Sequence, residues 1–244
     1  MEQIIKNVNM DELESGIIKL FIVAYESDSG KKIISKLYKE VEKLKGNNTA
    51  YIKEKWEKEA GRMLSEEEWE NISEQQWKTT CSLSWREYSW KNIVRYFITP
   101  IQRKSQGTRC WRLCGENKAN HFHIFWECPS IIPFWQGLKN CMENILKIEL
   151  PFTFDILYLG KRNQGITNPG DKYIFRIMLV AGKKAITRRW MKTDAPKMED
   201  WFDVMHNIYM MERLTFSARL ESDKFKNFWK NWVDFVLPLR ADFI

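Results

Sequence analysis

The stretch of sequence that decides the fold class is KYIFRIMLVAGKKAITRRW, which covers residues 172–190. Its apolar residues recur at helical spacing over one broad side: Ile174, Phe175, Ile177, Met178, Ala181 and Ala185. At about 100° per residue, Lys172, Arg176 and Lys183 fall together on the opposite side. The pattern predicts an amphipathic helix with one side in the core and one side in solvent.

The same helical periodicity extends outward in both directions. Toward the C-terminus, one helix is predicted from Pro196 onward and a last one that ends at Pro238. Toward the N-terminus, further helices are predicted over Ser130–Ile148 and Ser84–Phe97, and one begins at Ser65, where Glu68 completes a capping box. The stripes expected to face the core are Trp201, Met205, Ile208, Met211 and Leu214; Trp69, Ile72 and Trp77; Ile52, Trp56 and Ala60; and, farther upstream, Leu13–Ala24 and Ile33–Leu44. Because Pro151–Gly160 alone fits a strand as well as a helix, the expected fold is mainly α.

The composition excludes several classes of protein. The chain has 244 residues, 44% hydrophobic and 14% aromatic, with 12 Trp, which argues for a buried core and against disorder. Its longest apolar run, Ile177–Gly182, is too short to span a membrane, and charged residues interrupt the first twenty positions, where a secretory signal would be apolar. The five Cys are expected as metal ligands or free thiols. We therefore expect an intracellular protein of the nucleus or cytoplasm, with no membrane partner.

Basic residues concentrate in the middle of the chain. The whole sequence carries 39 Lys and Arg against 32 Asp and Glu, a net charge of +7. Residues 88–192 alone hold 18 basic and 6 acidic side chains, so this block supplies the entire excess. Such a block suits a surface that binds a polyanion, although a solvated basic face without a partner has the same composition.

Five potential metal ligands crowd into the segment from Cys110 to Cys128. Cys110 and Cys114 form a pair with a short spacer, and Gly115 lets the chain bend directly after them. His123 and Cys128 are spaced to supply the second pair. Zinc prefers thiolate and imidazole ligands, and these four residues would close a structural site with no position for water. The sequence therefore predicts helical domains around a small irregular module that is similar to a zinc knuckle.

Alternatives remain open for this segment. His121 could replace His123, but its longer gap to Cys128 suits a site less well, so His121 is expected as a spare imidazole beside the metal or facing nucleic acid. The residues could also be buried thiols and polar histidines without a metal. We divide the chain into a helical region over 1–105, the Cys/His module over 106–130 and a C-terminal helical domain over 131–244.

Basic and aromatic side chains alternate around the Cys/His module, and no acidic residue occurs between Glu87 and Glu116. Cations bind phosphates and exposed rings stack on unpaired bases, so this surface is expected to bind RNA or single-stranded DNA. Its expected residues are Lys91, Arg95, Arg103, Lys104, Arg109, Trp111, Arg112, Lys183, Lys184, Arg188 and Arg189, with Lys172, Arg176 and Lys192 as extensions. Trp111 is expected to be exposed, whereas Trp90, Tyr96 and Phe97 are expected in the core. Arg188 and Arg189 equally fit the stabilisation of a helix C-terminus.

Several motifs across residues 50–244 match a known pattern. They are Ser84-Trp-Arg-Glu87, Arg95-Tyr-Phe-Ile-Thr-Pro100, Cys110-Trp-Arg-x-Cys114, His123-x-Phe-Trp-x-Cys128 and Pro133-Phe-Trp135. Together they resemble the C-terminal region of the reverse transcriptase polyprotein of long interspersed elements, the non-LTR retrotransposons, of the fish and amphibian type. The resemblance implies a thumb- or wrist-like region within 1–105 and makes Cys110, Cys114, His123 and Cys128 the knuckle ligands. It also implies a role beside the polymerase in holding template RNA or target DNA. The gap between Cys114 and His123 is one residue longer than in many members of that family.

The sequence lacks the residues that polymerase chemistry needs. Nucleotidyl transfer uses paired carboxylates to hold two metal ions, and the chain has no Asp-Asp pair. No counterpart of the family's endonuclease is present, and Cys81, Cys141 and His206 suggest no nucleophile arrangement. We therefore expect a non-catalytic nucleic-acid-binding module with a bound zinc ion. The alternative is a structural or protein-interaction helical domain, docked on a reverse transcriptase core or another protein, or an inactive relic, with a vestigial knuckle.

Overall fold

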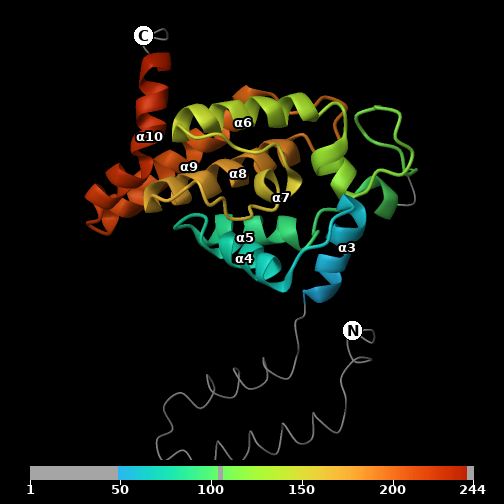
Figure 1. The fold of residues 1–244 in the computed structure, drawn as a ribbon. Coiled ribbons are helices and arrows are strands. Elements are labelled where there is room, and N and C mark those ends of the chain that lie inside the picture. The colour runs from blue at the N-terminus through green and yellow to red at the C-terminus, as the bar shows by residue number, and fades with distance from the viewer. Residues whose placement is uncertain (1–48, 104–106, 241–244) are drawn as a thin grey trace, which may run out of the picture. The chain divides into compact units, whose positions relative to one another are not determined.

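The computed structural model describes residues 49–103 and 107–240, and within these ranges it contains helices and no strand. The chain divides after Tyr51, and the described residues from Ile52 onward form one compact unit. The α-helices are α3 Ala50–Ala60, α4 Glu66–Trp77, α5 Leu83–Ile93, α6 Ile132–Leu146, α7 Phe154–Leu157, α8 Pro169–Arg188, α9 Met198–Ala218 and α10 Ser222–Arg240 (Figure 1). A 3-10 helix, Pro100–Gln102, and a π-helix, His123–Glu127, lie between α5 and α6. The mainly helical fold class is confirmed.

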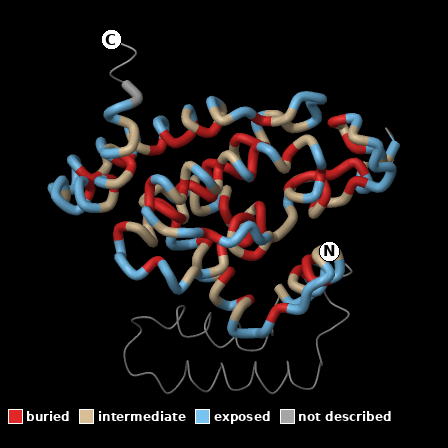
Figure 2. The backbone as a smooth tube through the Cα atoms, turned by 45° about the horizontal axis from the view of Figure 1, so that its top comes forward, coloured by how far each residue is buried: buried red, intermediate tan, exposed pale blue. Residues whose placement is uncertain are grey.

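Helix α8 is the centre of this unit. It contacts α5, α6, α9 and α10, and Figure 1 shows α6 on one side of it and α5 on the other. Every residue from Ile177 to Lys183 is buried, and Figure 2 shows the buried residues gathered along the inner helices. A helix that is covered on all sides has no solvated stripe. The expectation that Lys183 faces solvent is therefore wrong, because this side chain is only 1% exposed.

Local sequence sets where two of the helices begin. At the start of α4, the Ser65 hydroxyl accepts a hydrogen bond from the Glu68 amide, and the Glu68 carboxylate accepts one from the Ser65 amide, both at 3.0 Å. This confirms the predicted capping box. At the start of α8, the Asn168 side chain accepts from the Gly170 amide at 2.7 Å, and Pro169 occupies the first turn.

Buried Trp side chains hold the core together. Trp56, Trp69, Trp135, Trp201 and Trp229 are all less than 2% exposed. Three of their indole N–H groups donate to backbone carbonyls of other segments: Trp56 to Ile93 at 2.8 Å, Trp135 to Phe125 at 2.7 Å and Trp201 to Met178 at 3.1 Å. These bonds satisfy the polar end of a large apolar side chain, so the rings can be buried at little cost.

Glu212 on α9 is a buried carboxylate that joins four elements. It accepts hydrogen bonds from the Cys81 amide at 3.0 Å, the Tyr173 hydroxyl at 2.5 Å and the Trp229 indole N–H at 2.9 Å. These donors lie between α4 and α5, on α8 and on α10 respectively. Three donors satisfy a charge that is only 2% exposed.

Several expectations about individual positions are corrected. Trp77, Met211 and Leu214 are 47%, 61% and 63% exposed, because the neighbouring helices cover other faces of α4 and α9. Helix α10 continues past Pro238 to Arg240, because the fixed φ of proline is itself helical and its steric cost falls on the turn before it, not on the residues after it. Within Pro151–Gly160 the short helix α7 forms instead of a strand.

The helices predicted over residues 13–44 and the predicted binding residue Lys104 lie outside the described residues. In the part of the chain that the structure describes, no helix combines the length and the apolar character that crossing a bilayer requires.

Candidate metal centre

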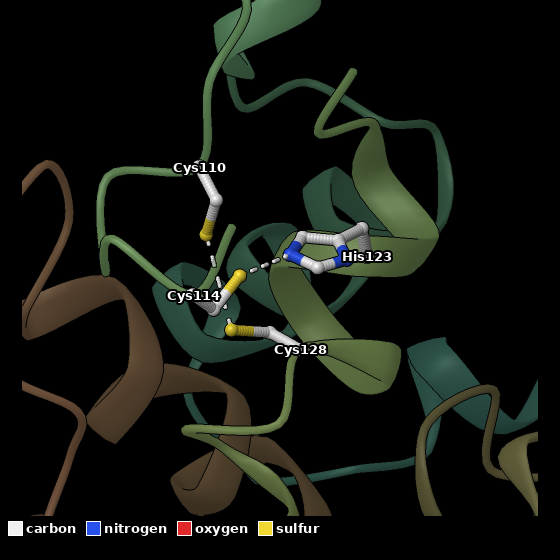
Figure 3. Close-up of side chains that lie close together, drawn as sticks. All are labelled: Cys110, Cys114, His123 and Cys128. Atoms are coloured by element: carbon white, nitrogen blue, oxygen red, sulfur yellow. Dashed lines mark hydrogen bonds between the residues drawn. The ribbon is translucent and has the colours of Figure 1, made fainter. Parts of the chain in front are cut away.

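The structure brings Cys110, Cys114, His123 and Cys128 together, as the sequence predicts. Their ligand atoms all lie within 4.8 Å of one another, and the four side chains point toward a common centre (Figure 3). The Cys110 and Cys128 sulfurs are 3.8 Å apart, and the Cys114 sulfur is 3.3 Å from His123 Nε2. In a tetrahedral zinc site with Zn–S bonds of about 2.3 Å, two sulfurs would be about 3.8 Å apart. The four residues therefore lie close enough to bind one metal ion.

A tight loop presents the first two ligands. The Leu113 amide donates to the Cys110 carbonyl at 3.1 Å, and the Cys110 amide donates to the Glu116 carbonyl at 2.9 Å. Leu113 has φ +56° and Gly115 has φ +98°, so the chain turns twice through left-handed conformations. Only glycine adopts the second of these at little cost, which explains why Gly115 follows Cys114 directly.

A π-helix presents the other two ligands. In an α-helix, residues five apart point in different directions, about 140° from each other. Here the Cys128 amide donates to the His123 carbonyl at 2.9 Å, the bond that defines a π-turn, and the wider turn brings these two residues to the same side. The Asn120 side chain fixes the start by accepting from the His123 amide at 2.8 Å.

Backbone amides support the thiolates. A hydrogen bond joins the Cys128 sulfur to the Cys110 sulfur, and the Ser130 amide also donates to Cys128; the contact with Cys110 contributes most to holding the pKa of Cys128 well below its usual value. The same contact with Cys128, together with burial, raises the pKa of Cys110, while the Arg112 amide donates to its sulfur and opposes that rise. A cation at the centre would favour the deprotonated form of both thiols.

Glu127 lies near the ring nitrogen of His123 that points away from Cys114. Its carboxylate oxygen is 3.9 Å from His123 Nδ1, while His123 Nε2 faces Cys114. In metal sites the second ring nitrogen commonly donates to a carboxylate, which orients the ring and selects the nitrogen that binds. Sequence reasoning did not assign this role to Glu127, although its position one helical turn after His123 is a signal for it.

His121 does not belong to the cluster, which decides between the two histidines. It is 1% exposed and packs edge-on against Trp56 and parallel to Phe125. Burial and, to a lesser degree, the Arg95 cation lower the pKa of His121 to about 3, so its ring is neutral at physiological pH. The expectation of an imidazole that faces nucleic acid is wrong, because the ring fills the core beneath the module.

Three of the predicted binding cations are turned inward. The buried Arg112 guanidinium donates to the Ile124 carbonyl at 2.8 Å, so it ties the first cysteine loop to the π-helix. Arg95 is paired with Glu59 and lies 4.6 Å from the centre of the Trp56 ring. Lys183 lies 5.0 Å from the Tyr158 ring in the middle of α8. These residues correct the expectation of a surface role, because each is held by packing or pairing inside the unit.

The other predicted cations lie nearer the surface. Arg109 and Arg188 are exposed, whereas Arg103 and Lys184 are half-buried. Lys91 is paired with Glu87 at 2.8 Å. Arg189 is paired with Asp194 at 2.6 Å and with Asp200 at 2.9 Å, an arrangement that fixes the loop after α8.

The aromatic residues near the module also differ from expectation. Trp111 is half-buried and meets Trp190 edge-on with ring centres 5.0 Å apart, so it is not the exposed ring. Tyr96, expected in the core, is instead 63% exposed. Phe97 packs against Trp190 at 5.6 Å, as a core residue would.

The four convergent side chains are the observation that identifies this candidate metal centre. A search of known protein families finds no family model that matches the sequence.

Proposed function

We propose that Cys110, Cys114, His123 and Cys128 bind a zinc ion that organises a nucleic-acid-binding module. The observation that carries the metal assignment is the convergence of three sulfurs and one imidazole nitrogen within 4.8 Å. Soft thiolates with imidazole in a tetrahedral arrangement are typical of zinc. All four positions come from the protein, which is typical of a structural ion and supports a binding role without catalysis.

The proposed nucleic-acid surface is a basic edge on the segments that meet at Trp190. We define this basic edge by its cations and one exposed ring: Arg103, Arg109, Lys184, Arg188, Lys192 and Tyr96. Their backbones belong to the segment after α5, the start of the Cys/His module and the end of α8.

Contacts through Trp190 hold these three segments together. Its ring lies 5.6 Å from Phe97, 5.0 Å from Trp111 and 5.2 Å from Phe125. In the same region, the Arg103 guanidinium contacts the Met191 sulfur at 2.9 Å. A metal ion that fixes the loop carrying Trp111 would therefore also fix the basic edge, which links zinc to binding.

Phosphate groups would bind the cations and unpaired bases would stack on Tyr96, so RNA or single-stranded DNA is the proposed partner. The resemblance to the C-terminal region of retrotransposon reverse transcriptases agrees with this assignment. By that resemblance, we propose that the module acts beside a polymerase, within the nucleus or cytoplasm of a cell.

The test combines metal analysis with oligonucleotide binding. Purified protein should contain one zinc ion per chain, and Cys110→Ser and Cys114→Ser should each lose it. Arg109→Gln and Arg188→Gln should keep zinc but bind single-stranded RNA more weakly, each reducing the log–log salt slope by about 0.7. Lys147→Gln, which removes an exposed cation at the end of α6, is the matched control and should bind normally.

Two outcomes would overturn the proposal. Purified protein that contains no zinc would contradict the metal assignment. A binding constant that does not change with salt concentration would contradict the phosphate contacts. Circular dichroism of each variant measures its helical content and so separates loss of binding from loss of folding. The Arg→Gln changes lie on the surface and should leave the helical content unchanged.

A protein-interaction domain is the second candidate. Its support is a set of exposed apolar side chains on α9, α10 and the turn between them: Met211 at 61%, Leu214 at 63%, Leu220 at 94% and Leu237 at 61%. Exposed apolar side chains on neighbouring helices can form part of a protein-binding surface. Protein that has neither zinc nor RNA affinity, yet binds a reverse transcriptase core through these residues, would make this function the better one.

A further inference from the structure

A polar cavity lies away from the Cys/His module, between α4 and the loop that precedes α8. Its volume is about 570 Å³, large enough for a small organic ligand. Glu67, Glu68 and Asn71 of α4 form one wall. The loop residues from Lys161 to Thr167, with Lys172 of α8, form the other.

Hydrogen bonds build the loop wall of this cavity. The Arg162 amide donates to the Asn71 side chain at 3.1 Å, which fastens the loop to α4. The Asn163 side chain accepts from the Gly165 amide at 2.8 Å, which shapes the loop's own turn. Together with the Asn168 cap of α8, these contacts hold both ends of the loop in place.

Positive charge remains at the cavity after the ion pairs are counted. Lys161 and Arg62 both pair with Glu68 and with Asp155, so these two cations and two carboxylates compensate one another. Neither Arg162 nor Lys172 has a carboxylate within 4 Å among the described residues. One turn after Lys172, burial lowers the pKa of Arg176, Tyr173 and Glu74 oppose this, and the neighbouring Arg162 adds a weaker lowering; the Nε of Arg176 is buried without a hydrogen-bond partner. An anion would compensate this local excess of cations.

The remaining lining selects the kind of anion. Asn71, Gln164 and Thr167 offer amide and hydroxyl groups, and Glu67 offers an exposed carboxylate that can accept from hydroxyls. Among the described lining residues, Ile166 has an apolar side chain. These residues include no aromatic ring on which a nucleobase could stack. The cavity therefore favours a small polyhydroxy group with a phosphate over a free nucleobase.

We propose that this cavity binds a phosphorylated sugar, with Arg162 and Lys172 on the phosphate and with Glu67 and Gln164 on the sugar hydroxyls. The ligand has two chemical sources: a free sugar phosphate, or the 5′-terminal phosphate and ribose of a nucleic-acid strand. The proposal goes beyond the nucleic-acid module, because its residues lie on α4, in the loop before α8 and near the start of α8, whereas the α8 residues of the basic edge lie near the other end of that helix.

Calorimetry on the full chain tests the site with ribose 5-phosphate as the probe and ribose as its unphosphorylated partner. Wild type should bind ribose 5-phosphate saturably and more tightly than ribose. Arg162→Gln and Lys172→Gln should each weaken that binding about tenfold, the effect of losing one charge-assisted contact to phosphate. Lys147→Gln should leave it unchanged.

A second arm distinguishes the two sources. If the ligand is a strand end, a 5′-phosphorylated oligonucleotide should bind wild type more tightly than its 5′-hydroxyl counterpart, and Lys172→Gln should abolish the difference. If it is free, ribose 5-phosphate should bind while the two oligonucleotides behave alike. Equal binding of each phosphorylated and unphosphorylated pair, or unchanged binding in both variants, overturns the site. Arg109→Gln separates the two proposals, because it should weaken all oligonucleotide binding without changing ribose 5-phosphate affinity.

Discussion

Replacing Lys183 by Met should stabilise the protein at neutral pH, because the wild-type side chain holds an ammonium group in the core. Lys183 is 1% exposed in the middle of α8. Burial lowers the pKa of Lys183 from 10.5 to about 7. Each unit of pKa difference between the folded and unfolded states corresponds to about 1.4 kcal/mol, so at pH 7 the burial of this group costs about 4 kcal/mol.

One other contribution reduces the expected gain. Met has nearly the shape of the Lys stem, so repacking should cost less than about 1.5 kcal/mol. The Tyr158 ring, whose centre lies 5.0 Å from the ammonium, acts on the charged form alone, so its effect is part of the folded-state pKa. We therefore expect Lys183→Met to raise the free energy of unfolding at pH 7 by about 2–4 kcal/mol.

The pH dependence gives the sharper test. The folded-state pKa lies below the unfolded value, so the unfolded chain binds more protons between pH 7 and 10.5, and wild-type stability rises with pH across this window. The penalty is absent above pH 10.5 and is almost complete once the pH has fallen to 7. Lys183→Met lacks this dependence, so its advantage over wild type should fall by about 3 kcal/mol between pH 7 and pH 9.5.

Urea denaturation of both proteins at several pH values, under reducing conditions, measures this difference. Taking the difference cancels the titration of groups that the two proteins share. Lys192→Met, a change at an exposed lysine near the end of α8, is the control and should alter stability by less than about 0.5 kcal/mol. A variant less stable than wild type at pH 7, or a difference that does not change with pH, would refute the reasoning.

Three further predictions concern the core, a helix start and the metal. Glu212→Ala should lower the free energy of unfolding by about 3 kcal/mol, because it leaves three donors unpaired, the buried Trp229 indole and the half-buried Cys81 amide and Tyr173 hydroxyl; a loss below about 1 kcal/mol in urea denaturation would contradict this. Ser65→Ala should cost about 1 kcal/mol through the lost cap of α4, seen as a lower melting temperature, and Ser65→Asp should restore it. Treatment with a chelator should lower the melting temperature of wild type but not of Cys114→Ser; equal shifts in both would argue against a metal at this site.

Close packing leads to a related expectation at Gly182. A Cβ at this position would lie 2.6 Å from the Leu138 side chain, where α8 approaches α6. Gly182→Val should therefore destabilise the protein by about 2 kcal/mol, whereas Gly137→Val, whose Cβ would meet a flexible Met198 side chain, should cost less. Calorimetric melting of the two variants compares them directly.

Features that depend on a few neighbouring residues were predictable from the sequence. The helices within the described ranges follow from apolar residues at helical spacing, and the capping box at Ser65 needs only the residue three positions later. The Cys110–Cys114 pair and the His123–Cys128 pair likewise follow from spacing, because a short spacer limits how far two ligands can separate. Local geometry is enough to decide each of these.

Features that depend on segments distant in sequence were decided by the tertiary structure. Lys183 and Arg112 are as basic as Arg109, and only the packing of other helices and of the π-helix shows that the first two are buried. The π-turn directs His123 toward the cysteines and leaves His121 against Trp56, a choice that spacing alone left open. The cavity beside Arg162 and Lys172 exists because α4 meets a loop about ninety residues later in the chain. Helical periodicity is encoded within a few turns of one segment, whereas burial and convergence depend on which other segment packs against it.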